Sequence, residues 1–470
     1  MKKNVRNLAQ LMPVILIFLA GCRLLDLLYV PEDEWHRILF HSYYTQERNI
    51  DQAFIGSSHI LCDVEPLLLD EINGDNNFNM SSPQQRFDAS YYLLKEMAGD
   101  HKLKHVYLEC YYLCVTDHEI YDKNSDSVRV SDYIGDPDHF ASSWQISYAM
   151  KPSLNSVAIQ LHASDRDHMI ENLLPFVRYR EKLFDWEHIS DNLSNFRPSS
   201  ERGYSFHIDY EEPDGSPWYQ EYHIKGDNSS NGRVFDSEKI FPKDRDLTRF
   251  GIGSRSRSYL CKSIEFCQKN NIPVTLFVSP VLDFQLLSTG DYDRYVTELK
   301  SLADGYGIEC YDMNLIKREY LDIKHGEYYM DPEHLNTAGA EVYTEALWNV
   351  LSDSADNNMS KFYTTYSEKL AAEEPEIYGL YRMPVSGDLT HRDDGNPEID
   401  MQYTIASNRD DMEYTVTNIV SDPASPSGKT EYIIQERNKN NTIVLPSGSH
   451  GTLRIESEYE GADLMLEVGY

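Results

Sequence analysis

Short apolar runs that alternate with amphipathic stretches constrain the fold of this chain more than any other feature. The apolar runs predict strands over residues 52–55, 77–81, 105–112, 272–279 and 308–313. Apolar residues at helical spacing predict helices over residues 65–72, 89–98, 256–269, 292–306 and 338–352. Alternating strands and helices indicate a parallel sheet covered on both faces. Functional sites in such α/β proteins lie at the carboxyl ends of the strands.

Two segments interrupt this alternation. Residues from about 115 to 250 are polar and rich in Asp, Ser, Asn and Tyr, with helical pieces around 169–183. They are too long for a loop, so we expect a mostly helical insertion. Beyond residue 385, short strands between turn residues predict a small all-β C-terminal module. The expected strands cover residues 401–405, 413–419, 431–435, 442–445, 452–456 and 464–468.

The N-terminus has the pattern of an export signal or a membrane anchor. Lys2, Lys3 and Arg6 precede an uncharged run over residues 11–22. In one interpretation, residues 8–30 form a single membrane-spanning helix. In the other, Leu19-Ala20-Gly21-Cys22 is similar to a bacterial lipobox, and Cys22 is lipidated after cleavage. Both interpretations predict anchoring to the cell membrane by residues 1–30, with the rest of the chain extracytoplasmic.

Composition excludes several classes of function. The formal net charge of −34 argues against nucleic-acid binding, because a polyphosphate would be repelled. The seven cysteines form no C-x-x-C pair, so we expect no metal site, and nothing in the sequence calls for a cofactor. Hydrophobic residues make up 41% of the chain, which is enough to build a core. We therefore expect one α/β domain over residues 31–360, followed by the module over residues 385–470.

Two short motifs contain the parts of an activated oxygen nucleophile. Ser57 and Ser58 follow the first predicted strand, and Asp331 and His334 precede the last predicted helix. A hydroxyl is a weak nucleophile at neutral pH and needs a base, and that base needs a group to orient it. A histidine can accept the serine proton and then protonate the leaving alcohol. His59, next to the serines, is expected to be structural.

Phe54-Ile55-Gly56-Ser57-Ser58-His59 and Asp331-Pro332-Glu333-His334 resemble the first and last blocks of the SGNH/GDSL hydrolase superfamily. The similarity is to the membrane-anchored bacterial branch of DltD-type and alginate-acetylation acyltransferases, and it covers residues 50–112 and 254–352. The resemblance implies a flavodoxin-like, three-layer α/β/α fold. It also implies hydrolysis or transfer of acyl groups on cell-surface polymers.

The resemblance assigns roles to individual residues. Ser58 takes the place of the nucleophile, His334 that of the base, and Asp331 that of the group that orients the base. Ser57 stands where the GDSL form has Asp, and it is the alternative nucleophile. Ser81 replaces the oxyanion glycine of the second block and would donate its backbone N–H, and Gln85 would add a side-chain donor. The Gly-x-Asn-Asp element of the third block is missing at residues 108–112.

The sequence therefore predicts an extracytoplasmic serine esterase or O-acyltransferase that works through an acyl-enzyme. Its expected partner is a cell-surface polysaccharide or another acylated envelope polymer, together with a membrane-bound acyl donor if the reaction is transfer. The missing third block leaves an alternative of another class. In that alternative the fold is kept as a non-catalytic protein that binds surface polysaccharide.

Overall fold

The computed structural model defines most of the chain. It describes residues 13, 17–18, 20–30, 35–83, 85–112, 142–163, 169–194, 234–236, 252–287, 292–323, 328–329, 333–384, 400–446 and 449–469.

A five-stranded parallel sheet forms the centre of the molecule. Its strands are β1 (Gln52–Gly56), β2 (Asn77–Ser81), β3 (His105–Glu109), β5 (Val274–Val278) and β6 (Cys310–Asp312). They are arranged in the order β2-β1-β3-β5-β6, and every neighbouring pair is parallel. The sequence prediction of a parallel sheet is confirmed. β2 and β3 lie on opposite sides of β1. The chain therefore runs one way across the sheet from β1 to β2 and the other way from β2 to β3. The position where this direction reverses is a topological switch point, and a crevice opens there at the carboxyl ends of the strands.

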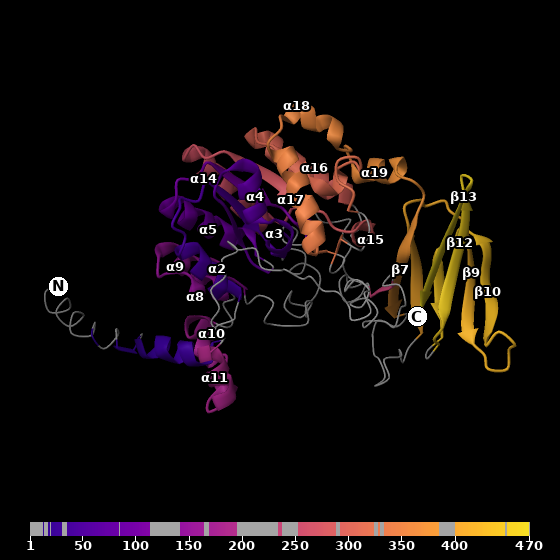
Figure 1. Ribbon diagram of the computed structural model, residues 1–470, viewed down its shortest axis with the longest axis horizontal. Coiled ribbons are helices and arrows are strands. Elements are labelled where there is room, and N and C mark those ends of the chain that lie inside the picture. The colour runs from indigo at the N-terminus through magenta and orange to yellow at the C-terminus, as the bar shows by residue number, and fades with distance from the viewer. Residues whose placement is uncertain are drawn as a thin grey trace.

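Helices cover both faces of this sheet because alternate strand residues are buried on opposite sides. One core cluster contains Ala53 and Ile55 of β1 and residues of α5 (Phe87–Asp100), α14 (Ser254–Lys269) and α16 (Tyr292–Tyr306). A second cluster lies on the opposite face. It contains Phe54 of β1 and residues of α3 (Ser58–Asp63), α4 (Pro66–Asn73) and α17 (Thr337–Leu351). Figure 1 shows the resulting layers, with α17 and α4 in front of the sheet.

The insertion contains several short helices within its described part. These are α8 (Ser142–Ala149), α9 (Leu154–His162), α10 (Met169–Leu173), the 3₁₀ turns η2 (Pro175–Val177) and η3 (Arg180–Lys182), and α11 (Trp186–Ser194). They lie beside α2 (Trp35–Tyr44) and the N-terminal segment, where residues 20–29 are helical. Among the described residues, no helix is both long enough and apolar enough to cross a membrane.

The C-terminal module is all-β, as the sequence predicts, and its two sheets pack around one core. One sheet has the order β10-β9-β12-β13 and the other the order β11-β8-β7-β4. The strands are β7 (Ile377–Pro384), β8 (Met401–Ser407), β9 (Tyr414–Ser421), β10 (Lys429–Asn438), β11 (Thr442–Leu445), β12 (Thr452–Tyr459) and β13 (Ala462–Gly469). The edge strand β4 (Val234–Asp236) comes from the insertion and pairs in parallel with β7.

Shorter elements complete the α/β domain and lead from it to the module. They are α15 (Asp283–Leu287), η5 (Met313–Leu315), α18 (Ala355–Asn358), η7 (Met359–Lys361) and α19 (Tyr366–Ala372). Figure 1 labels three of them, α15, α18 and α19. Tyr378 and Ala406 of the module are buried in the same cluster as α17. The module is therefore attached to the α/β domain through apolar contacts as well as through the chain.

Candidate functional site

Ser58 lies at the carboxyl end of β1, where the strand turns directly into α3. Ser57 is the N-cap of α3, with its hydroxyl 3.5 Å from the His59 N–H, and Ser58 is the first helical residue. The turn needs Gly56. A Cβ there would lie 2.5 Å from the Glu109 Cβ and 2.6 Å from a side-chain carbon of Ile60. The glycine therefore lets β1 pass close to β3, and the serine turn lies against the end of that strand.

Folding brings His334 to Ser58 from a distant part of the sequence. His334 Nε2 lies 2.8 Å from Ser58 Oγ, which is the distance of a good hydrogen bond. Both residues are half-buried. If Nε2 accepts the hydroxyl proton, Nδ1 carries the imidazole proton, and this is the tautomer that a general base requires. The arrangement can therefore activate the Ser58 hydroxyl.

One short helix positions both members of this pair. Asp63, at the end of α3, is fully buried, and its Oδ1 accepts a 3.0 Å hydrogen bond from the backbone N–H of Leu335, next to His334. The Thr344 hydroxyl of α17 donates to the Asp63 carbonyl at 3.3 Å and accepts from the Glu65 N–H at 3.0 Å. The segment before α17 is thus fastened to α3. Any movement of α3 would move nucleophile and base together.

His59 packs beneath the pair as part of the core. Its ring is fully buried and stacks on the His334 ring, with centroids 4.8 Å apart and planes 22° apart. The Tyr111 ring lies 3.8 Å away on centroids, and Nδ1 is 3.7 Å from Asp63 Oδ2. These contacts fix the plane of the His334 ring. His59 is therefore a buried residue that supports the His334 ring, as the sequence predicts for a structural residue.

Glu109 is a site residue that the sequence analysis missed. It ends β3, is buried, and accepts hydrogen bonds on Oε2 from both the N–H and the hydroxyl of Ser57, each at 3.1 Å. Burial raises its pKa to about 7, while the Ser57 hydrogen bonds and the charge of His334 pull that pKa down. A buried glutamate that titrates near neutral pH beside a serine–histidine pair is a marker of a functional site. In the sequence, the only indication of this role was that Glu109 is a charged residue within a predicted buried strand.

The two adjacent serines have different surroundings. The Ser57 hydroxyl is buried, donates to Glu109 and caps α3. Ser58 is half-buried and meets His334. Because Ser57 is occupied in holding the turn, the geometry disfavours it as the alternative nucleophile and favours Ser58.

The two residues expected at the oxyanion hole lie at the end of β2, next to β1. Ser81 pairs with Gly56 across the sheet, and its hydroxyl donates to the Asn79 side chain. Gln85 is buried, and its amide donates to the Met80 carbonyl at 3.2 Å and to the Ser90 hydroxyl at 3.0 Å. Both protons of that amide are used inside the protein. The expected side-chain donor role of Gln85 therefore has no support in this geometry.

Asp331 and Cys22 are the two remaining residues that the sequence analysis singled out. Asp331 lies outside the described residues, between Tyr329 and Leu335, which form an isolated antiparallel bridge. Cys22 lies on the N-terminal helix and is buried, with 7% of its surface exposed. Its lipidation stays a prediction. No cluster of potential metal ligands occurs within the described part of the chain.

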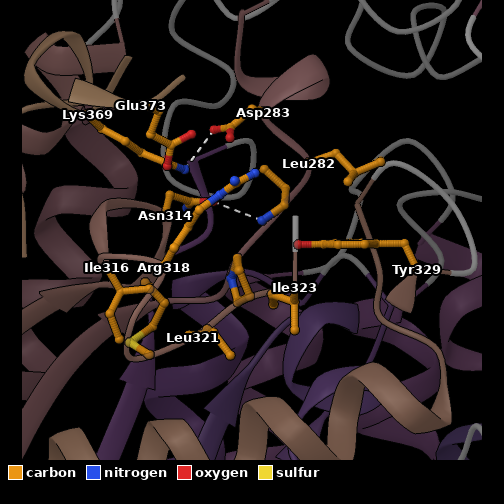
Figure 2. Close-up of a pocket in the computed structure, with 13 residues that line it drawn as sticks. Leu282, Asp283, Asn314, Ile316, Arg318, Leu321, Ile323, Tyr329, Lys369 and Glu373 are labelled. Atoms are coloured by element: carbon orange, nitrogen blue, oxygen red, sulfur yellow. Dashed lines mark hydrogen bonds and ion pairs between the residues drawn. The ribbon is translucent and has the colours of Figure 1, made fainter. Parts of the chain in front are cut away.

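A small pocket of about 40 Å³ lies beyond β5 and β6, at the same end of the sheet (Figure 2). Arg318 and Tyr329 line it, together with a buried ion pair between Lys369 and Asp283 with a 2.8 Å contact. Tyr329 connects the pocket to the serine–histidine pair, because it bridges to Leu335, the neighbour of His334. The pocket is about large enough for a few water molecules.

Comparisons with known proteins add no family assignment. No family model matches the chain, and no curated protein matches it. Among solved structures, a double mutant of the endo-beta-1,4-mannanase from Cellulomonas fimi aligns with 95% of this chain and 98% of its own, at 10% identity. Its TM-score is 0.16, so this likeness carries no argument about fold or function.

Proposed function

We propose that this chain is an SGNH-type serine esterase or O-acyltransferase that acts on acyl esters of a cell-surface glycan, outside the cytoplasm. One observation supports the proposal most: the 2.8 Å contact between Ser58 Oγ and His334 Nε2 at the carboxyl end of a parallel sheet. The strand order, which matches that of flavodoxin-like sheets, puts this pair at the switch point beside β1 and β3. The chain's resemblance to the superfamily's first and last motifs agrees with this position.

The reaction follows from the roles of the two side chains. Ser58 Oγ attacks the acyl carbonyl, and its proton passes to His334 Nε2. The carbon–oxygen bond to the leaving alcohol then breaks, and that alcohol takes the proton from His334. Water or a sugar hydroxyl next gives its proton to His334 and attacks the acyl-enzyme. The bond between the acyl carbon and Ser58 Oγ breaks, and Ser58 Oγ takes that proton back from His334. Asp331 is proposed to orient the imidazole.

Backbone groups are the proposed oxyanion donors. The first N–H groups of a helix have no partner within it, and Ser58 is the first residue of α3. Its N–H is the natural first donor, and that of Ser81 on the neighbouring strand is the proposed second. Glu109 is proposed to hold the serine turn and, when ionised, to stabilise the imidazolium that forms on His334.

Two observations favour the alternative of a non-catalytic binding protein. The third block of the superfamily is missing, and Glu109 occupies the end of β3. Gln85, expected at the oxyanion hole, is occupied within the fold. A protein of this kind would bind a polysaccharide without acylating Ser58.

Hydrolysis of p-nitrophenyl acetate tests the enzyme proposal. The full chain is expected to release p-nitrophenol in a burst followed by slower turnover, because deacylation is expected to be slower than acylation. Ser58→Ala is expected to lose the burst, and Ser81→Ala to keep it, since only the backbone of Ser81 is assigned a role. Adding a soluble oligosaccharide separates the two reactions: acylated sugar indicates transfer, and acetate alone indicates hydrolysis. A folded wild-type protein that releases p-nitrophenol no faster than the uncatalysed background would favour the binding protein.

A further inference from the structure

The N-terminal helix and the insertion helices together present an unusual exposed apolar face. Leu24 and Leu27 point outward from the N-terminal helix. Ile170 and Leu173 are exposed on α10, and Trp186 and Leu193 are exposed on α11, with Trp186 at 75%. We call these six residues the apolar face. Several large apolar side chains exposed on neighbouring helices are typical of a surface that contacts a partner or a membrane.

The helical spacing explains why these residues share one side of their helices. Ile170 and Leu173 are three residues apart, and Trp186 and Leu193 are seven apart, so each pair falls on one face. On α11, Ile189 lies on the same stripe as Trp186 and Leu193 but is buried, and Glu187 and Asp191 lie roughly a third of a turn from Trp186. The helix is therefore amphipathic, and its polar side carries the acidic residues Glu187 and Asp191.

Polar contacts fasten these helices to the N-terminal helix. Asp26 is buried and accepts a 3.1 Å hydrogen bond from the Phe176 N–H. His188 Nε2 lies 2.8 Å from the Tyr29 carbonyl, and the Asn192 amide donates to the Leu28 carbonyl at 3.0 Å. Figure 1 shows the N-terminal helix reaching away from the α/β domain beside α10 and α11. The apolar face is thus built from two segments that hold each other in place.

A basic pocket of about 510 Å³ opens beside this face. Its cations are Arg23, Arg37 and Lys151, and its aromatic walls include Tyr44 and Tyr148. The Arg23 guanidinium lies 4.7 Å from the Tyr148 ring centroid, and the Lys151 ammonium lies 4.2 Å from that of Tyr44. Leu27 belongs to both the pocket and the apolar face.

The charge of the pocket is opposite to that of the chain. Arg23 reaches Asp26 at 3.7 Å, and the charges of both Arg23 and Arg37 stabilise this carboxylate. Two further acidic residues lie near Tyr44: Glu96, which accepts from Ser153 and Asn155, and Asp100. Arginine and lysine side chains are the usual ligands of phosphate oxygens. In a chain of net charge −34, a surface pocket with three cations favours an anion.

From this arrangement we propose that the apolar face rests on a lipid membrane and that the basic pocket binds the phosphate of an anionic lipid headgroup. The acyl chains of that lipid would lie along Leu27 and Leu24, which continue from the pocket. The inference goes beyond the proposed ester chemistry and does not depend on it. It assigns the insertion a membrane contact separate from any anchoring by the N-terminal segment.

Trp186 reports directly on the apolar face. The full chain is reconstituted into vesicles of phosphatidylcholine and phosphatidylglycerol with brominated acyl chains, which quench only nearby indoles. Wild type is expected to be quenched, and Trp186→Phe is expected to lose most of the quenched emission. The matched control Trp348→Phe, on α17 in the α/β domain, is expected to keep it. Quenching that is the same in Trp186→Phe and wild type would overturn the membrane contact, because the N-terminal segment alone would then carry the attachment.

Lys151 tests the headgroup site, and Lys262 provides a matched control. Both lysines are exposed and stack on a tyrosine, but Lys262 is on α14, outside the pocket. Retention of phosphatidylglycerol by the detergent-purified full chain is measured by mass spectrometry of the intact protein. Lys151→Gln is expected to weaken retention roughly tenfold, the effect of one lost charge-assisted hydrogen bond. Lys262→Gln is expected to leave it unchanged.

Three outcomes would contradict the headgroup site. Equal retention of phosphatidylglycerol by the Lys151→Gln and Lys262→Gln variants would show that the pocket does not bind the lipid. Equal retention of phosphatidylglycerol and phosphatidylcholine by the wild-type chain would show that the site does not select an anionic headgroup. Displacement of the lipid by inorganic phosphate at similar concentration would assign the pocket to a free anion and overturn its role at the membrane.

Discussion

At the scale of single residues, Glu109 couples the site to pH. Its carboxylate is buried, and its pKa is raised from 4.5 to about 7. The folded protein therefore binds a proton more tightly than the unfolded chain between these two values. Stability contributed by this group is highest below pH 4.5, falls as the pH rises, and reaches its lower limit above pH 7. The loss is on the order of 3 kcal/mol.

Glu109→Gln is expected to remove this pH dependence. The glutamine oxygen can still accept both hydrogen bonds from Ser57, but it never carries a charge. The free energy of unfolding of the variant, relative to wild type, should therefore rise between pH 5 and pH 8. Chemical denaturation at the two pH values measures the difference. A constant difference between variant and wild type would mean that Glu109 does not titrate in this range.

The same variant tests whether Glu109 assists the histidine. Ionised Glu109 stabilises a positive charge on His334, so the acylation rate of Glu109→Gln should fall below that of wild type above pH 7. Below that pH the two proteins should acylate at similar rates, since wild-type Glu109 is then neutral. Stopped-flow burst rates with p-nitrophenyl acetate across the pH range provide the measurement. A uniform loss at all pH values would point to a structural role alone.

At the scale of secondary-structure elements, the start of α17 sets the position of His334. Asn336 caps the helix by accepting from the Gly339 N–H at 3.0 Å, and its own N–H donates to the Tyr328 carbonyl at 3.0 Å. A Cβ on Gly339 would lie 2.1 Å from that carbonyl oxygen. Only glycine allows the helix to begin this close to the segment that carries the histidine.

Gly339→Ala is expected to force this helix start outward. The free energy of unfolding should fall by about 1–3 kcal/mol, the usual cost of overpacking, and the acylation burst should slow because His334 moves with the helix. Gly305→Ala on α16 is the control, because nothing lies within 4 Å of its added Cβ. That substitution should be neutral or stabilising by up to about 1 kcal/mol. Equal effects of the two substitutions on the burst would contradict the positioning role.

The elements that sequence predicted best are those with a strong local pattern. The strand over residues 77–81 and the helix over residues 292–306 have the predicted bounds. The six predicted strands of the C-terminal module all occur. Several elements were missed because their partners are far away in the sequence or their pattern is too short, among them α3, β4 and β7. In particular, β7 begins at Ile377, before the expected start of the module at residue 385.

In the candidate site, too, the residues that lie in short sequence motifs were predicted, and the residues defined by contacts between distant parts of the chain were not. Ser58 and His334 were found because each lies in a recognisable short motif. Glu109 was missed because its partner, Ser57, is 52 residues away and a lone glutamate has no spacing pattern. Asp63 was missed for the same reason, since it fastens Leu335 from a separation of 272 residues. Such contacts appear only when the strands are placed side by side.

At the scale of the whole molecule, the net charge of −34 sets the response to salt. Like charges on a compact chain repel one another, and the repulsion is screened as the Debye length falls from about 30 Å at 0.01 M to about 8 Å at 0.15 M. The thermal unfolding midpoint should therefore rise between these two concentrations. NaCl and KCl should act alike, because screening is not ion-specific. A midpoint that falls or stays constant would show that ion pairs outweigh the repulsion.

The central claim is that Ser58, activated by His334, is a nucleophile. Labelling with a fluorophosphonate probe tests it most directly, because the probe bonds covalently to activated serines and releases fluoride. The account predicts a single adduct on the Ser58 peptide of the full chain, lost in Ser58→Ala and retained in Ser57→Ala once circular dichroism shows that both variants are folded. No adduct on the folded wild type, or an adduct that persists in Ser58→Ala, would contradict it.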